Sequence, residues 1–149
     1  MARRIKKING YRSKFENSIG TQILEHKIDP KKIYETTVID YIKPETHHTY
    51  TVDFALPNGI LIEAKGRWVL EDRKKHMLIR EQHPELDIRF VFSNSKAKLY
   101  KGAKSRYCEW CDKHEFKWEH RIIPEAWLKE KGKPIRVKLI PFKGEKKVT

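Results

Sequence analysis

Residues 53–66 read DFALPNGILIEAKG and form the stretch of the chain that decides its fold. Apolar residues surround a Pro-Asn-Gly turn signal, a pattern that predicts a β-hairpin in the middle of a core. The same stretch carries Asp53, Glu63 and Lys65. Because an isolated buried charge is costly unless it is paired or binds a metal, three charged residues in such a hairpin need a partner or a function.

The length of the turn decides which of these side chains face one another. A two-residue turn at 58–59 points Asp53 away from the other two charges. A three-residue loop at 57–59 pairs Leu56 with Ile60 and places the two carboxylates opposite each other. The proline suits the first central position of a type I turn and the glycine suits a left-handed position, so we predict the three-residue loop.

In this register Asp53, Glu63 and Lys65 share one face of the hairpin, since alternate residues of a strand point to the same side. Two carboxylates beside an ammonium group form a site for a hard cation. The alternative is the solvated face of an antiparallel hairpin, where such charges make weak cross-strand pairs. The spacing D-x9-E-x-K is loose and leaves both alternatives open.

The composition indicates a polyanionic partner. The chain has 149 residues, enough for one domain, with 33 Lys and Arg against 20 Asp and Glu, a formal net charge of +13. Nucleic acid is the first candidate and an anionic membrane surface the second. The sequence shows no secretory signal and no apolar run long enough for a membrane span, so we expect a soluble intracellular protein with reduced thiols at Cys108 and Cys111.

Periodicity predicts an α/β domain, a mixed β-sheet flanked by helices. The helices are expected over 15–28, 71–83 and 103–114, and the strands over 32–40, 49–56, 60–65 and 87–92. Residues 42–47 contain a proline and no apolar period, which predicts an extended connector. The domain is expected to span 11–128, between a basic N-terminal arm at 1–10 and a basic, partly ordered tail at 129–149.

Two longer stretches of the sequence are similar to those of a known protein family. Residues 48–66 read HTYTVDFALPNGILIEAKG, and residues 72–102 read DRKKHMLIREQHPELDIRFVFSNSKAKLYKG. With Arg67 and Trp68 between them, they resemble the bacteriophage endonuclease I family of Holliday-junction resolvases, and the resemblance runs from about Tyr11 to Trp127. It implies a restriction-endonuclease-like core, the PD-(D/E)xK nuclease motif and hydrolysis of branched DNA, four-way junctions above all.

The resemblance also implies the roles of the charged residues. Asp53 and Glu63 would bind divalent metal with the Ala64 backbone carbonyl, and Lys65 would assist the chemistry. Glu16 would complete the acidic set, although Ser13 to Glu16 also fits a helix-capping box that would use the same carboxylate. The implied cofactor is Mg²⁺, replaceable by Mn²⁺, with two ions in each active site. Val52 stands where the motif usually has proline, from which we expect a local effect on the strand.

The family consists of intertwined homodimers that exchange strands and share active sites. The resemblance therefore implies a homodimer in which a bridge segment near 42–48 crosses to the partner, acting in the cytoplasm of the infected bacterial host. Spacing and charge suggest DNA contacts on the basic helix, near the hairpin and in the N-terminal arm. The candidate residues are Arg73, Lys74, Lys75, His48, Arg3, Arg4, Lys6 and Lys7.

Other signals have more ordinary explanations. Cys108, Cys111 and His114 suggest zinc, with His120 as the only nearby fourth ligand, but small thiols packed on a helix explain them better. Two other functions remain open. One is a non-catalytic branched-DNA-binding or architectural protein on the same fold, and the other is a sequence-specific endonuclease.

Overall fold

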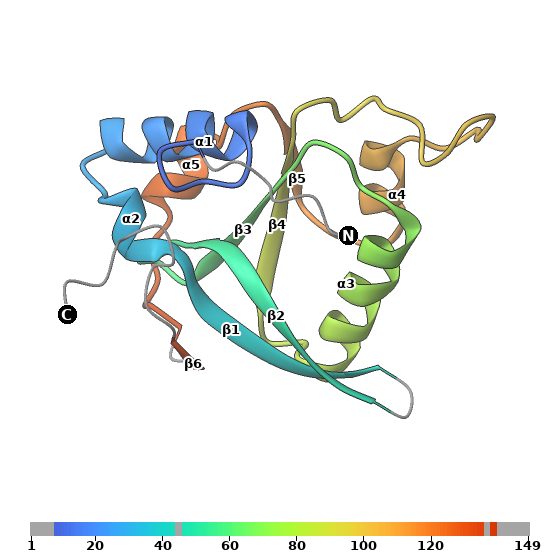
Figure 1. Cartoon of the computed structure of the whole chain (residues 1–149), viewed down its shortest axis with the longest axis horizontal. Coiled ribbons are helices and arrows are strands. Elements are labelled where there is room, and N and C mark those ends of the chain that lie inside the picture. Colours follow the sequence, from blue (N-terminus) through green and yellow to red (C-terminus); the bar gives the residue numbers. More distant parts are fainter. Residues whose placement is uncertain (1–7, 44–45, 136–137, 140–149) are drawn as a thin grey trace.

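The computed structural model describes residues 8–43, 46–135 and 138–139. Its centre is a six-stranded sheet in the order β5-β4-β3-β2-β1-β6 (Figure 1). The strands are β1 (Tyr34–Lys43), β2 (Thr46–Ala55), β3 (Ile60–Lys65), β4 (Asp87–Phe92), β5 (Trp118–His120) and β6 (Lys138–Leu139). The helices are α1 (Lys14–Glu25), α2 (Pro30–Ile33), α3 (Leu70–Gln82), α4 (Tyr107–Lys113) and α5 (Glu125–Lys129). The predicted mixed sheet flanked by helices is confirmed.

The helices cover both faces of the sheet, with α1, α2 and α5 on one side and α3 and α4 on the other (Figure 1). Each face has its own apolar core. Ile19 and Ile23 of α1 pack with Ile62 of β3, while Trp68 and Ile79 pack on the other face. A strand covered on both faces is mostly apolar, as the first three residues of β3 are: Ile60, Leu61 and Ile62. The strand is buried from Ile60 to Ala64, and Lys65 at its end is partly exposed.

The hairpin between β2 and β3 has the predicted three-residue loop. The Leu56 N–H donates to the Ile60 carbonyl at 2.8 Å, and the Gly59 N–H donates to the Leu56 carbonyl at 3.0 Å. Gly59 has φ +91°, the left-handed conformation that glycine adopts without strain. On the far side of β3, β4 runs parallel to it, so the hairpin lies at the centre of the sheet.

The described residues of 42–47, predicted as an extended connector, are extended and pair with one another. Ile42 pairs with His47 and Lys43 pairs with Thr46, so β1 and β2 form one long antiparallel hairpin. The proline that suggested a connector is Pro44, which lies outside the described residues, and β-branched residues on both sides extend the ladder up to it. The described residues of the predicted bridge segment near 42–48 therefore belong to the paired ends of β1 and β2.

Shorter elements were missed because they carry too few residues to show a period. They are α2, α5, β5 and β6. The predicted helix over 15–28 ends at Glu25, and the one over 103–114 begins only at Tyr107. None of the described helices is long and apolar enough to cross a membrane.

The segment predicted as a tail is attached to the sheet at its start. The Asn58 side chain donates to the carbonyls of Trp127, at 2.8 Å, and Glu130, at 3.0 Å. The Glu130 carboxylate also pairs with the buried Arg89 guanidinium at 2.5 Å. Trp127 and Glu130 therefore hold the loop of the central hairpin, and β6 pairs with β1. Residues 136–137 and 140–149 lie outside the described residues.

Candidate active site

The strands β2 and β3 separate where the charged residues lie. Their ladder ends at the pair of Phe54 with Ile62. One position further, side chains replace the backbone pairing: the Asp53 carboxylate accepts from the Ala64 N–H at 3.0 Å, and the Asp53 N–H donates to the Glu63 carboxylate at 3.1 Å. Charge-assisted bonds to backbone N–H groups offset part of the cost of burying these carboxylates and fix their positions. We call this site, where β2 and β3 diverge at Asp53, Glu63 and Ala64, the fork.

Lys65 lies at the end of the same strand. Its Nζ is 3.4 Å from Oε2 of Glu63, and the two side chains are only 18% and 1% exposed. Burial alone lowers the pKa of the Lys65 ammonium, but the neighbouring Glu63 and Asp53 carboxylates raise it above its ordinary value. Lys65 is therefore a charged group at neutral pH, suited to electrostatic stabilisation rather than to accepting a proton.

Helix α1 brings a third carboxylate to the fork. Ser13 caps the helix by accepting from the Glu16 N–H at 3.0 Å, and its hydroxyl lies 3.4 Å from the Glu16 carboxylate. The other carboxylate oxygen of Glu16 accepts from the Tyr34 hydroxyl at 2.8 Å. Ser13 thus supplies the cap that the sequence suggested, while the Glu16 side chain, 6% exposed, turns towards the sheet.

These groups line one cavity of about 340 Å³. Its lining residues are Arg12, Glu16, Glu35, Thr49, Tyr50, Thr51, Asp53, Glu63, Ala64, Lys65 and Lys75. Four carboxylates thus face three cations. Arg12 pairs with Glu35 at 2.9 Å and Lys75 pairs with Asp72 at 3.8 Å, which leaves Lys65 as the cation nearest the fork.

Two of the cavity carboxylates, Asp53 and Glu16, have raised pKa values. Burial, followed by the negative charges of Glu63 and Glu16, raises the pKa of Asp53 well above its ordinary value. Burial also raises the pKa of Glu16, although its hydrogen bond from Tyr34 opposes the change. A cation placed among these oxygens would favour their ionised forms.

The donor set fits a hard divalent cation, which prefers carboxylate and carbonyl oxygens. Asp53 and Glu63 are adjacent, and Glu16 faces the same cavity. In the part of the chain that the structure describes, no three side chains of His, Cys, Asp or Glu form a ready-made metal cluster. A cation would therefore be held first by the two carboxylates of the fork, with backbone oxygen or water completing the shell.

Comparison with known proteins places the chain in a family. The model of a family described as Phage endonuclease I matches residues 1–147. The chain belongs to this family. It is 48% identical over 146 residues to "Endonuclease I" of Escherichia phage T7, covering 98% of this chain and 97% of the relative. It is 52% identical over 125 residues to "Endodeoxyribonuclease 1" of Enterobacteria phage T3, covering 84% and 81% respectively.

Two charged residues that line the cavity of this phage endonuclease I family member were not predicted from the sequence: Arg12 and Glu35. Glu35 is 3% exposed, has φ +50° and lies at an irregularity of β1, where its carboxylate binds the Arg12 guanidinium. Nothing in the segment YETTVID distinguishes Glu35 from an ordinary strand residue. Arg12 lies next to the helix-capping serine, so its proximity to Glu16 was the one usable signal.

Arg73, one of the predicted phosphate contacts, lies on the inner side of its helix. Its side chain is buried, 5% exposed, and the guanidinium donates to the backbone carbonyls of Trp68, at 3.0 Å, and Leu99, at 3.4 Å. The residue is on the inner face of α3, where a long aliphatic stem packs and the charged end satisfies carbonyls. Its neighbour Lys74 is exposed and remains available to a ligand.

The other predicted contacts lie in different places. Lys75 lines the acidic cavity, with its ammonium 4.9 Å from the centre of the Tyr50 ring. His48 lies on β2, where its ring stacks on Tyr41 and bonds the Thr46 hydroxyl at 2.7 Å, and it is not a lining residue of the cavity. The remaining four fall outside the described residues: Arg3, Arg4, Lys6 and Lys7.

Cys111 has the packing role predicted for the two cysteines. Cys108 and Cys111 are free thiols, and Cys111 is fully buried in the core beneath α4. Burial raises the pKa of the Cys111 thiol above its ordinary value, so this thiol stays protonated in the core.

Proposed function

We propose that the chain is a metal-dependent endonuclease that resolves four-way DNA junctions and other branched DNA by phosphodiester hydrolysis, on a restriction-endonuclease-like core. The observation that carries this proposal is the fork of β2 and β3, which gathers Asp53, Glu63 and Lys65 with Glu16 around one cavity. The relatives named endonuclease I and endodeoxyribonuclease 1 support the reaction class. As they are phage proteins, we place the activity in the cytoplasm of the infected bacterial host.

The cofactor in this proposal is Mg²⁺, with Mn²⁺ as a substitute and two ions in each active site. Asp53, Glu63 and Glu16 would hold the metal with the Ala64 carbonyl. When bound, such ions supply an activated water and positive charge for the phosphate oxygens.

The protein groups then have separate tasks. The carboxylates of the fork are held by backbone N–H groups, which fixes their orientation before DNA arrives. The Lys65 ammonium donates to the phosphate oxygens, where negative charge grows as the water attacks. The net charge of +13 brings the DNA to this site through its phosphates, so binding should weaken steeply as salt rises.

Cleavage of a labelled four-way junction beside its linear duplex arms tests this function. We expect symmetric cuts near the branch with Mg²⁺, little cutting of the arms, and none in EDTA. Glu63→Gln should still bind the junction and leave it intact, because the amide cannot supply an anionic oxygen. Junction binding by the wild type without any cuts would instead favour the non-catalytic architectural protein, and equal cutting of the linear arms at a fixed sequence would favour the sequence-specific enzyme.

We also propose that the enzyme is an intertwined homodimer whose bridge near 42–48 crosses between chains. The last described pair of the β1–β2 ladder, Lys43 with Thr46, lies there, and opening this ladder would let β2 of one chain pair with β1 of the other. Each active site would then combine Glu16 of one chain with the Asp53–Lys65 hairpin of its partner.

Complementation between two inactive variants tests the sharing of active sites. Glu16→Gln and Glu63→Gln are co-expressed with different tags, and the heterodimer is purified through both. If sites are shared, one of the two sites contains both substitutions and the other contains neither, so the heterodimer should nick the junction while each variant homodimer stays inactive. An inactive heterodimer would mean that each site is built within one chain.

A further inference from the structure

The connection from β4 to α4 folds into a finger, residues 96–106, that projects beyond α4 (Figure 1). The Leu99 N–H donates to the Ser105 carbonyl at 3.0 Å, and Lys98 forms a bridge with Arg106. At the tip, the Ala103 N–H donates to the Tyr100 carbonyl at 3.0 Å, and Gly102 has φ +86°. This is a type II turn, so backbone bonds set the shape of the finger in advance.

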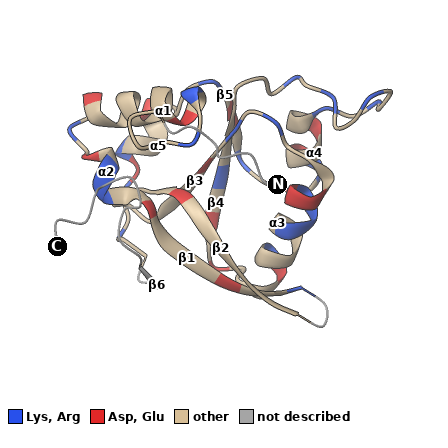
Figure 2. Cartoon of the chain, in the orientation of Figure 1, with Lys and Arg blue, Asp and Glu red and all other residues tan. Residues whose placement is uncertain are grey.

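The finger is strongly basic. Its cations, all exposed, are Lys96, Lys98, Lys101, Lys104 and Arg106. The sequence has no carboxylate from 93 to 108, and Figure 2 shows the basic residues along this connection without acidic ones among them. Their positive charge is therefore not neutralised within the finger, which favours an anionic ligand.

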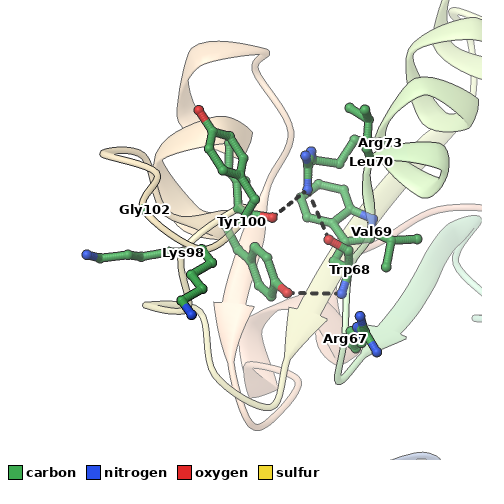
Figure 3. A pocket seen from close by; sticks show the side chains of 11 residues that line it. Arg67, Trp68, Val69, Leu70, Arg73, Lys98, Tyr100 and Gly102 are labelled. Carbon is green, nitrogen blue, oxygen red and sulfur yellow. Dashed lines mark hydrogen bonds between the residues drawn. The ribbon is translucent and has the colours of Figure 1, made fainter.

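A pocket of about 800 Å³ lies between the finger and the start of α3 (Figure 3). Its cations are Arg67, Lys98 and Lys101, with the buried Arg73 behind them, and no carboxylate lines it. It also presents flat and apolar surface, because Tyr100 is 66% exposed and Leu70 is 51% exposed. The pocket thus offers both cations and an exposed aromatic ring to one ligand.

Buried groups hold the two walls of the pocket together. The Arg73 guanidinium donates to carbonyls of both walls, Trp68 before α3 and Leu99 in the finger. The Tyr107 hydroxyl accepts from the Trp68 N–H at 3.1 Å. Arg67 of the pocket follows Lys65 of the acidic cavity by two residues, so the two sites are close along the chain.

We propose that the finger and its pocket bind a nucleotide of the DNA strand beside the cleavage site, with the base stacked on Tyr100 and the phosphates on Lys98, Lys101 and Arg67. This inference rests on the proposed DNA endonuclease function. Cations without acidic neighbours select phosphate, and an exposed ring selects the face of a base, so the combination fits a nucleotide whose base is unstacked. Such nucleotides occur at the branch points of DNA and are rare in an intact duplex.

Binding of a labelled four-way junction and of its linear arms, measured in EDTA over a range of salt concentrations, tests the proposal. Tyr100→Ala should weaken junction binding about tenfold and duplex binding much less, because one base–aromatic stack is lost. Tyr100→Phe keeps the ring and should bind as the wild type does. The double variant Lys98→Gln/Lys101→Gln should lower the slope of log affinity against log salt by about two.

The matched control is Lys31→Gln/Lys32→Gln, which removes two exposed cations from α2 at the other end of the molecule. It should keep the wild-type preference for the junction and most of the salt slope. Unchanged junction binding by Tyr100→Ala, or an equal loss in Tyr100→Phe, would overturn the stacking. An equal loss of slope in the control would overturn the phosphate contacts at the finger. If the wild type itself neither binds nor cuts junctions, the proposed function fails instead.

Discussion

Replacing Asp53 by asparagine is expected to abolish cleavage, by about a thousandfold or more, and to raise the stability of the metal-free protein. The amide keeps the shape of the carboxylate and still accepts from the Ala64 N–H, so the fork should fold as before. It cannot provide the anionic oxygen that a divalent cation needs. The variant should bind junction DNA with wild-type affinity in EDTA and leave it uncut when Mg²⁺ is added.

The gain in stability follows from the protonation of Asp53. Its pKa is raised in the folded protein, by burial and by the charges of Glu63 and Glu16. A group with a raised folded-state pKa contributes stability that is fully present below its unfolded pKa and is lost as the pH rises through the folded value. The neutral amide does not ionise, so the difference in melting temperature between variant and wild type should grow as the pH rises above about 4.

Thermal unfolding in EDTA, followed from acid to neutral pH, measures this difference. We expect a gain of about 2–4 °C at neutral pH, the shift that about 1 kcal/mol produces in a domain of this size. Asp40→Asn is the matched control, because Asp40 lies on β1 outside the acidic cavity, with its carboxylate half exposed. It should cleave normally and gain nothing. A variant at Asp53 that is less stable than the wild type at every pH would contradict the argument from burial.

Replacing Lys65 by methionine should reduce the cleavage rate by about 10²–10³, the usual cost of losing one preorganised donor to a developing oxyanion. Methionine keeps most of the aliphatic stem and removes the ammonium. In this electrostatic role the ammonium stays protonated, so the wild-type rate should show no titration of this group between about pH 6 and 9. A lysine acting as base would instead need a lowered pKa and would produce a step in that range.

Lys75→Met is the control for this variant. Lys75 lines the same cavity, but its ammonium pairs with Asp72 on its own helix at 3.8 Å. Single-turnover cleavage with saturating enzyme separates the chemical step from binding, and here Lys75→Met should stay within a few fold of the wild type. Equal losses in the two variants would show that the net charge of the cavity matters and that the position of Lys65 does not.

The centre of the fold was predictable because it depends on local signals. Pro57 and Gly59 fix the loop length, the loop length fixes the register, and the register brings Asp53 opposite Glu63. The apolar runs of β3 and β4 then identify the buried strands. Glu16 was reached only through the family resemblance, since the same residue also fits a helix cap.

Other features depend on contacts between distant residues, which no local pattern contains. Arg73 belongs to a basic run in the sequence, yet it lies on the inner face of α3 and bonds to Leu99. Glu35 becomes a cavity residue only through the irregularity in β1 and the approach of Arg12. The β1–β2 pairing extends to Lys43 and Thr46, because the β-branched Ile42 and Thr46 continue the strands beyond the point where the proline in the sequence suggested an end.

Binding of Mn²⁺ to the metal-free protein, followed by electron paramagnetic resonance, tests most directly whether the fork is a metal centre. We predict that the wild type binds Mn²⁺, that Mg²⁺ displaces it, and that Asp53→Asn and Glu63→Gln each lose most of this binding while Asp40→Asn keeps it. Equal Mn²⁺ binding by the wild type and the two fork variants would contradict the proposal, because the cation would then be held somewhere other than at Asp53 and Glu63.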